Sequence, residues 1–448
     1  MAKTISNIVV CRGSCNTISV LKIIFSGFVF LLVSCSEVKE PGLFTYERTI
    51  RDSGVTAWHP NGKWLAVHHR KNINVWNVEA NKKITILTQN LGVSLYENSQ
   101  LIFSKDGQYL IALDEGKFSR KASLTVKKSR LVGYVWATAD WSLVTKLMLP
   151  DANKFSVPKG LCLLADGRRA VIANRHYIAI FDIETGEQTY RNSMIFPFDD
   201  KSIEFDFFTM RCHPTQNKVA LGGFKPLKID GDYQSDPDVT FSTPSVPFLI
   251  FDPDKNTFDQ HIAHTKRILL DYSGDGAYLI TSPSRGGRSK LPKGWDKPYR
   301  PKDENMRWYI AQEPAYIWDT NDWQTRHNLE LPRQFFHGLQ TYNQLACMVP
   351  VPGTPLHIIC DAPANKPRPG HIRKGPILRL WDLRTGRSHG QLPDRTSYTV
   401  SLSSDGKRIA VLVKSGIEIY RLRIPPELLR DSQHSRVESN AVKQFDKE

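Results

Sequence analysis

Short runs of apolar and β-branched residues, separated by tight turns, recur along the whole chain and predict a succession of β-strands. Each repeat has a turn residue, which is glycine in six of the seven copies, then a β-rich run, then an aromatic residue that closes a second β-rich run. The clearest copy has the turn Asn61-Gly62 and closes at Trp76. Asn-Gly and Asp-Gly pairs favour such turns because they accept the positive φ values that a tight hairpin requires.

Seven of these units follow one another. Their turn residues and closing aromatics are Gly62 and Trp76, Gly107 and Trp136, Gly167 and Phe181, Asn217 and Phe251, Gly276 and Trp318, Gly353 and Trp381, and Gly406 and Tyr420. A four-stranded sheet cannot bury both faces alone, so repeated sheets stack around an axis. The sequence therefore predicts an all-β fold, a seven-bladed β-propeller over residues 43–424.

The ends of the repeat array predict how the ring closes. After Tyr420 the chain reaches Pro425-Pro426, so no fourth strand follows for the seventh unit. A strand-like run at residues 43–50 precedes the first unit and is left unassigned. We expect this run to be the outer strand of blade seven, closing the ring as a clasp, and residues 425–448 to form a polar C-terminal tail.

Two of the closing segments carry a family resemblance. Residues 181–186 read FDIETG and residues 381–386 read WDLRTG, and both resemble the Trp-Asp region of WD repeats. The family's Gly-His pair is absent, and Ala137 and Arg421 stand where its aspartate is expected. The Ser-x-Asp-Gly turns are also similar to those of Tol-type periplasmic propellers. The resemblance implies the propeller fold and a role in protein interaction.

The N-terminus has a different pattern. An apolar segment at residues 23–32 leads into Leu32-Val33-Ser34-Cys35-Ser36, which resembles the lipobox of bacterial lipoprotein precursors. The resemblance implies a signal peptide at 1–34, acylation of Cys35 and a lipidated tether at 35–42. Serine rather than aspartate after Cys35 implies the periplasmic side of the outer membrane. A plain signal peptide or short anchor is the alternative, and the start codon could lie further in.

Charge adds a hypothesis about partners. Beyond the predicted signal the chain has 57 basic and 45 acidic residues, a net charge of +12. Blades two, four, five and six carry insertions between their second and third strands, and strand alternation places these on one face. Residues 114–133, 282–314 and 361–376 have net charges of +4, +4 and +3, whereas residues 224–246 have −2. This surplus of positive charge favours an anionic protein or glycan of the envelope as the partner. Because the chain is expected to be exported, we expect no role for nucleic acid. We expect the protein to be a monomer or a subunit of a larger complex.

The blade-five insertion mixes cations with flat rings and is the candidate partner-binding segment. Guanidinium groups grip carboxylate or phosphate, and exposed rings stack on sugars or anchor proteins. The candidate residues are Arg285, Arg288, Lys290, Lys293, Trp295, Lys297, Tyr299 and Arg300. The alternative is that long solvated loops merely collect charge and act as spacers.

Catalytic motifs are missing from the sequence: it has no nucleophile elbow, no zinc-protease pair and no phosphate loop. We therefore expect no catalytic residues, no metal and no cofactor. His261 and His264 are too poorly placed for a metal site. An enzyme acting on a small molecule or glycan at the central channel is the alternative to an interaction platform.

Four cysteines lie beyond Cys35. Cys347 and Cys360 are symmetric about the turn at Gly353, so a hairpin register places them opposite each other and makes them candidates for a cross-strand disulfide. We expect Cys162 and Cys212, on inner strands, to remain free thiols.

Overall fold

The structure is a computed structural model of the 448-residue chain. It describes residues 18–25, 28–35, 42–69, 72–88, 101–113, 130–149, 160–173, 177–193, 195–198, 201–229, 232–233, 246–264, 268–283, 314–329, 331, 333–336, 339–342, 344–362, 377–392 and 399–429. The chain divides into two units, Met1–Gly42 and Leu43–Glu448. The first unit contains one antiparallel hairpin of β1 (Ile18–Phe25) and β2 (Phe28–Cys35), in which Cys35 is paired with Ile18.

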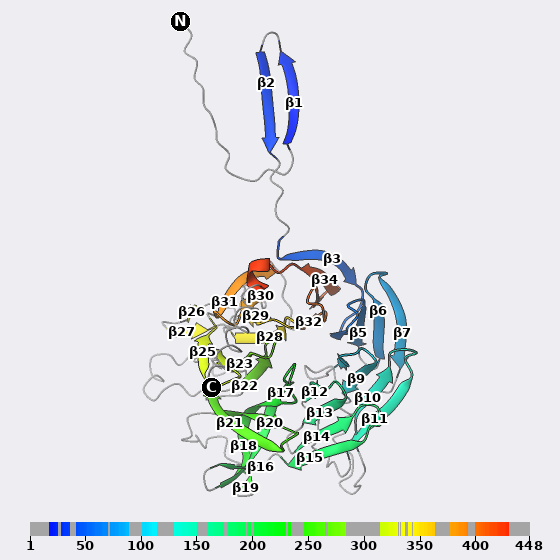
Figure 1. Ribbon diagram of the computed structural model, residues 1–448, viewed down its shortest axis with the longest axis vertical. Helices are drawn as coiled ribbons and strands as arrows, with labels where there is room; N and C mark the ends of the chain where they lie inside the picture. Colours follow the sequence, from blue (N-terminus) through cyan, green and yellow to red (C-terminus); the bar gives the residue numbers. More distant parts are fainter. Residues whose placement is uncertain are drawn as a thin grey trace, which may run out of the picture. The chain divides into compact units, whose positions relative to one another are not determined.

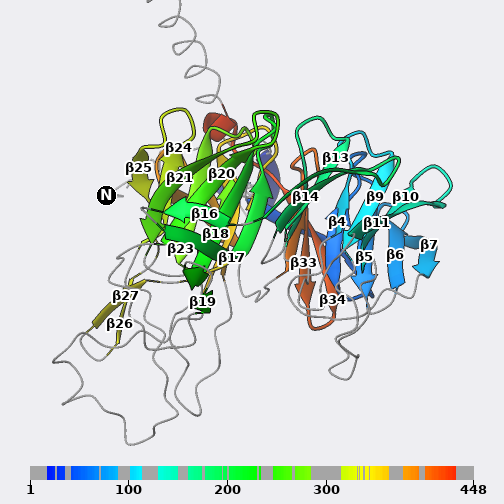
Figure 2. The same ribbon diagram turned by 90° about the horizontal axis from the view of Figure 1, so that it is seen from below.

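The second unit is a ring of antiparallel sheets, the blades (Figures 1 and 2). Blade one consists of β4 (Val55–Trp58), β5 (Trp64–His69), β6 (Asn72–Asn77) and β7 (Lys82–Thr88). Blade two consists of β8 (Leu101–Phe103), β9 (Tyr109–Leu113), β10 (Arg130–Ala137) and β11 (Leu143–Leu149). Blade three consists of β12 (Gly160–Leu163), β13 (Arg169–Ala173), β14 (Tyr177–Asp182) and β15 (Gln188–Ser193).

Blade four is the largest sheet and departs from the expected four strands. It has β17 (Lys201–Cys212), β18 (Val219–Ile229), β20 (Val246–Asp252) and β21 (Thr257–His264), and it is extended by β16 (Ile195–Phe198) and β19 (Asp232–Tyr233). The extension arises because β17 and β18 are 12 and 11 residues long, so their far ends pair beyond the rest of the sheet.

Three blades complete the ring. Blade five consists of β22 (Ile268–Tyr272), β23 (Tyr278–Pro283), β24 (Tyr316–Asp319) and β25 (Thr325–Asn328). Blade six consists of β28 (Gln344–Pro350), β29 (Leu356–Ala362), β30 (Ile377–Asp382) and β31 (Arg387–Leu392). Blade seven consists of β32 (Val400–Leu402), β33 (Arg408–Val413), β34 (Gly416–Leu422) and β3 (Phe44–Ile50). Between blades five and six lies an additional hairpin, β26 (Arg333–Phe336) with β27 (Leu339–Tyr342), which the sequence analysis did not foresee.

The seven-bladed all-β propeller predicted from the repeats is the observed fold. Every closing aromatic lies on the third strand of its blade, from Trp76 on β6 to Tyr420 on β34. The outer strand of blade seven comes from the beginning of the chain, because β3 pairs with β34 from Phe44↔Leu422 to Ile50↔Ile417. A single helical turn at residues 426–429 follows the ring.

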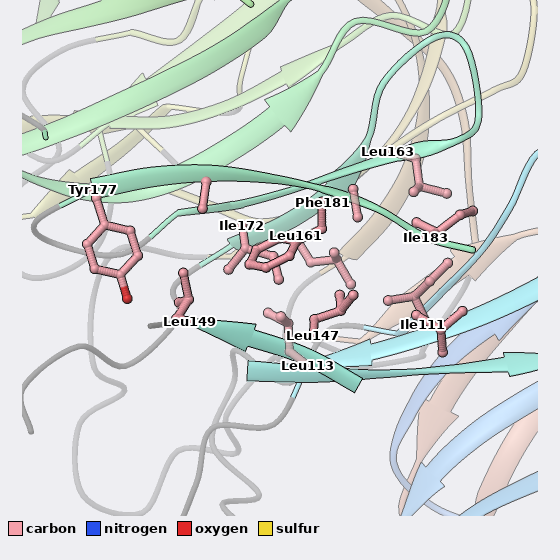
Figure 3. Packing of buried hydrophobic residues seen from close by; sticks show 13 residues of the cluster. Ile111, Leu113, Leu147, Leu149, Leu161, Leu163, Ile172, Tyr177, Phe181 and Ile183 are labelled. Atoms are coloured by element: carbon pink, nitrogen blue, oxygen red, sulfur yellow. The ribbon is translucent and has the colours of Figure 1, made fainter. Parts of the chain in front are cut away.

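The hydrophobic core lies between the blades. Seven clusters of buried apolar side chains occur in the described part of the chain, one at each contact between neighbouring blades. Figure 3 shows the cluster between blades two and three, where Leu147 and Leu149 of β11 meet Leu161 and Leu163 of β12. The apolar packing of each blade is therefore shared with its two neighbours, and closing the ring gives every blade both of these contacts.

Topology gives the ring two unlike faces. First-to-second-strand and third-to-fourth-strand turns lie on one face, which we name the turn face. Second-to-third-strand connections and the links between blades lie on the opposite face, the loop face. All four long insertions connect second to third strands, so they leave the ring from the loop face.

Candidate binding surfaces

The loop face carries the predicted binding segment. The blade-five insertion leaves the ring after Pro283, at the end of β23, and returns at Tyr316, at the start of β24. The eight candidate residues between Arg285 and Arg300 lie outside the described residues, as do residues 114–129 of blade two and 363–376 of blade six. The structure therefore shows where these segments join the strands, which is on one face of the ring. The basic surface itself stays a prediction.

The turn face is built from hydrogen-bonded turns. In blades two, five and seven the turn serine donates to the aspartate two residues on, as in Ser104 Oγ to Asp106 Oδ1 at 2.5 Å. The serine oxygen in turn accepts the backbone N–H five residues on, as from Tyr109 at 2.9 Å. The following glycine has a positive φ, +77° at Gly107, which explains the Ser-x-Asp-Gly pattern of the sequence.

Two histidines pin neighbouring blades together on the same face. His59 Nδ1 accepts the backbone N–H of Asn61 at 3.0 Å, and Nε2 donates to the carbonyl oxygen of Gly107 in the next blade at 2.9 Å. His213 in blade four repeats the contact with Gly276 of blade five at 3.0 Å. Burial lowers the pKa of both, that of His213 to about 4, so each ring is neutral at pH 7. These histidines are structural.

Charged side chains on the turn face form ion pairs, some within one blade and some between neighbouring blades. Arg169 of blade three contacts Asp166 at 2.5 Å and Asp254 of blade four at 3.0 Å. Arg408 of blade seven contacts Glu79 of blade one at 3.4 Å. Exposed pairs of this kind contribute little to stability, but they balance the local charge.

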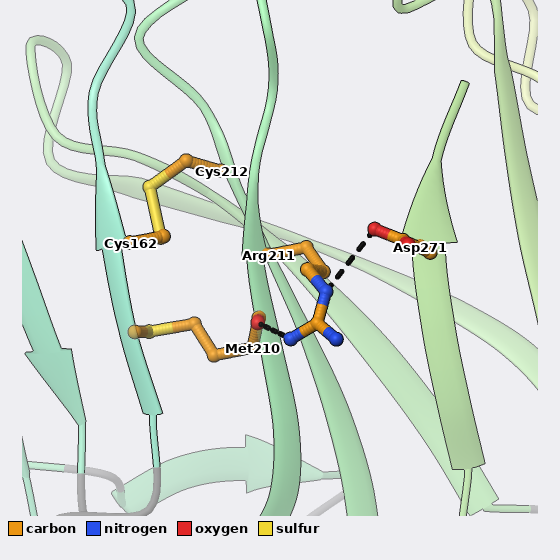
Figure 4. The surroundings of a disulfide bond; sticks show 5 residues. All are labelled: Cys162, Met210, Arg211, Cys212 and Asp271. Carbon is orange, nitrogen blue, oxygen red and sulfur yellow. Dashed lines mark hydrogen bonds and ion pairs between the residues drawn. A yellow bond between two sulfur atoms is a disulfide. The ribbon is translucent and has the colours of Figure 1, made fainter. Parts of the chain in front are cut away.

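A buried polar cluster near the central channel joins three blades. Arg211 Nε on β17 donates to Asp271 Oδ1 on β22 at 3.1 Å, and Arg211 Nη1 donates to the carbonyl oxygen of Met210 at 2.9 Å (Figure 4). His357 Nε2 on β29 lies 3.3 Å from Asp271 Oδ2. Asp271 is 4% exposed and His357 is fully buried, whereas the Arg211 side chain is 37% exposed. Only the guanidinium can therefore reach solvent.

His357 occupies a position that is apolar in the other six blades. In each blade this is the second-strand residue that pairs with the last residue of the first strand, as His357 pairs with Pro350. The equivalent residues are all fully buried: Leu65, Leu110, Ala170, Val219, Leu279 and Ile409. Sequence reasoning missed this cluster, although aligning the second strands of the repeats would have singled out His357. Its residues lie on separate blades, and only closure of the ring brings them together.

The cysteines give one agreement and one correction. Cys347 and Cys360 are paired across β28 and β29, as their register predicts, and form a disulfide. The expectation that Cys162 and Cys212 remain free is wrong, because they form a second disulfide with a Cα–Cα distance of 5.6 Å (Figure 4). Their strands, β12 and β17, are the inner strands of adjacent blades, and the sulfurs meet in the core between them.

No group of three potential metal ligands occurs among the residues that the structure describes. His261 is held between the rings of Phe248 and Trp323, with centroid distances of 5.1 and 4.6 Å. Its role in the described region is packing. In the described part of the chain, none of the helical structure has the length and apolar character of a membrane span.

Comparisons with known proteins support the fold. Two solved structures are similar, one titled "Structure of U3-55K" and one titled "Crystal structure of RRP9 WD40 repeats". Each is 11% identical and covers 84% of this chain, with TM-scores of 0.53 and 0.55 over 98% and 97% of the other chains. At this identity the likeness shows a WD40-like propeller fold and no more. No family model matches the chain, and no curated protein matches it.

Proposed function

We propose that this protein is a lipid-anchored, exported propeller that serves as an interaction platform for an anionic protein or glycan of the bacterial envelope. One observation carries the proposal: all four long insertions, with a combined net charge of +9, leave a closed ring from the same face. Insertions gathered on one face of a repeat fold commonly form its binding surface.

The ring suits such a role because its blades are fixed to one another. Apolar clusters fill each contact between blades, and turn-face hydrogen bonds such as His59 to Gly107 add to them. A rigid support lowers the entropy lost when loops engage a partner. WD40-like propellers commonly act as protein-interaction scaffolds, and the two similar structures share that fold with this chain.

Export and acylation rest on the lipobox at Cys35. Two disulfides, Cys162–Cys212 and Cys347–Cys360, support the export step, because disulfides persist in oxidising compartments such as the periplasm. The tether between Cys35 and the ring enters at β3, which begins on the turn face. The loop face then looks away from the anchoring membrane and remains accessible to partners.

The alternative, an enzyme acting at the central channel, has one described candidate site, the cluster of Arg211, Asp271 and His357. Both Asp271 and His357 are buried, and Asp271 is engaged by two partners. A general base must reach its substrate within hydrogen-bond distance. Of the three side chains only Arg211 could do so, and a lone guanidinium favours binding over catalysis.

A pull-down from envelope extracts tests the platform. In the test variant four residues of the blade-five insertion are reversed to glutamate: Arg285, Arg288, Lys290 and Lys293. In the matched control four exposed turn-face residues are reversed to glutamate: Lys63, Arg168, Lys255 and Lys407. We expect the wild type and the control to retain a partner that elutes with rising salt, and the test variant to lose it. Equal retention by the test variant would overturn the proposal.

A further inference from the structure

The outer strands of blades one and two carry an exposed apolar surface. Ile84 and Ile86 on β7 are 40% and 46% exposed, and Val144 and Met148 on β11 are 39% and 38% exposed. We name these four residues the apolar rim. Leu87 and Leu147 on the same strands are buried against the neighbouring blades, so the exposed residues are not the packed side of their strands.

A comparison among the blades shows that the apolar rim is a local feature. The outer strand is bulged in six blades, and the residue skipped by the pairing register is equivalent in each. In the order of blades one, two, three, five, six and seven, these residues are Ile84, Val144, Thr189, Arg326, His389 and Glu47. Only blades one and two have an aliphatic residue there. The fold alone therefore does not require the apolar side chains.

The apolar rim lies beside the point where the chain enters the ring. The tether joins at β3 of blade seven, and Arg48 on β3 donates to the carbonyl oxygens of Val78 and Glu79 in blade one at 2.6 and 2.8 Å. β3, β7 and β11 all begin on the turn face. Residues 36–42 span at most about 25 Å, so an acylated Cys35 would hold this side of the ring close to the bilayer.

Each strand of the apolar rim also presents a lysine. Lys82 precedes Ile84 on β7, and Lys146 lies between Val144 and Met148 on β11, and both lysines are exposed. Aliphatic side chains flanked by lysines suit the boundary between acyl chains and anionic headgroups.

We propose that the apolar rim is a second membrane contact, which seats blades one and two on the same bilayer that holds the lipid of Cys35. The inference rests on the proposed lipid anchor. The contact sets the orientation of the ring, with the outer edge of blades one and two against the headgroups. Because the rim residues are spread along the outer strands, from Ile84 and Val144 near the turn-face ends to Ile86 and Met148 further along, seating them covers the edge of the ring and leaves the loop face free.

Spin labels on the acylated full-length protein in anionic vesicles test this orientation. Single cysteines replace Ile84 and Ile86 in blade one, and, as matched controls at equivalent positions, Thr189 in blade three and Asn328 in blade five. We expect the two rim labels to collide several-fold more with membrane-dissolved oxygen than with an aqueous nickel complex. The two control labels should show the opposite ratio.

The outcomes separate the two proposals. Failure of the protein to float with the vesicles overturns both the lipid anchor and the rim contact. Flotation with all four labels open to the nickel complex overturns the rim contact alone. Rim labels shielded from both reagents, with dipolar broadening between labels, would show that a second copy of the chain covers the rim, and would also overturn the inference. Comparing Ile84 with Ile86 guards against a local effect at one labelled position.

Discussion

Breaking the Cys162–Cys212 bond should lower the free energy of unfolding more than breaking the Cys347–Cys360 bond. The first bond spans a sequence separation of 50 and joins two blades, whereas the second spans 13 within one hairpin. Closing a chain loop of these lengths restricts the unfolded chain by about 4 and about 3 kcal/mol, respectively. We therefore expect losses of these sizes as upper values, with the inter-blade bond contributing about 1 kcal/mol more.

The assay is urea unfolding of the oxidised protein and of two double variants, Cys162→Ala with Cys212→Ala and Cys347→Ala with Cys360→Ala. The reduced wild type serves as a control, because reduction breaks both disulfides while all four cysteine side chains remain in place. Alkylation under denaturing conditions, followed by mass analysis, establishes which thiols are free. An unchanged midpoint for the first double variant, or free thiols at Cys162 and Cys212 in the oxidised protein, would refute the reasoning.

Three further predictions follow from the ring and its turns. Deletion of residues 43–50 should abolish cooperative unfolding of the entire ring, seen as loss of the thermal transition in circular dichroism, since blade seven would lack its outer strand. Gly276→Ala should destabilise the protein by more than Gly353→Ala, which should cost only the about 1–2 kcal/mol of a left-handed residue. An added Cβ at Gly276 would lie 2.3 Å from the His213 ring, while none lies within 4 Å at Gly353, and equal melting temperatures would contradict this. Because the folded state keeps His213 neutral down to about pH 4, the protein should lose up to about 3 kcal/mol as pH falls from 6.5 toward 4. His213→Gln should flatten that part of the stability profile, and an unchanged slope would count against it.

The repeats predicted the fold because each carries its own signals. A turn glycine with positive φ and a buried aromatic on the third strand recur in nearly every blade, as Gly167 and Phe181 show. These are local requirements that each blade meets within its own stretch of sequence, and in blade three the two residues are 14 positions apart. The hairpin disulfide of Cys347 and Cys360 was predictable for the same reason, since symmetry about one turn fixes its register.

Contacts between blades could not be predicted in this way. Cys162 and Cys212 lie at positions that are not equivalent in their repeats, and their strands meet only because consecutive blades pack side by side. The cluster of Arg211, Asp271 and His357 has the same origin. Its members come from three blades, and no periodicity within one repeat connects them.

The positions of the stabilising contacts explain why we assign stability to the turn face and partner binding to the loop face. The turn face holds hydrogen bonds that cross from one blade to the next, such as Ser404 Oγ to the carbonyl oxygen of Pro60 at 2.5 Å and Lys105 Nζ to the carbonyl oxygens of Ala165 and Pro214 at 3.0 and 2.6 Å. A substitution there disturbs two or three blades at once. The insertions on the opposite face leave the ends of β9, β18, β23 and β29, beyond the clusters that hold the ring together. They can therefore gain length and charge with little loss of stability, which is why we expect a binding surface to have developed on the loop face and not on the turns.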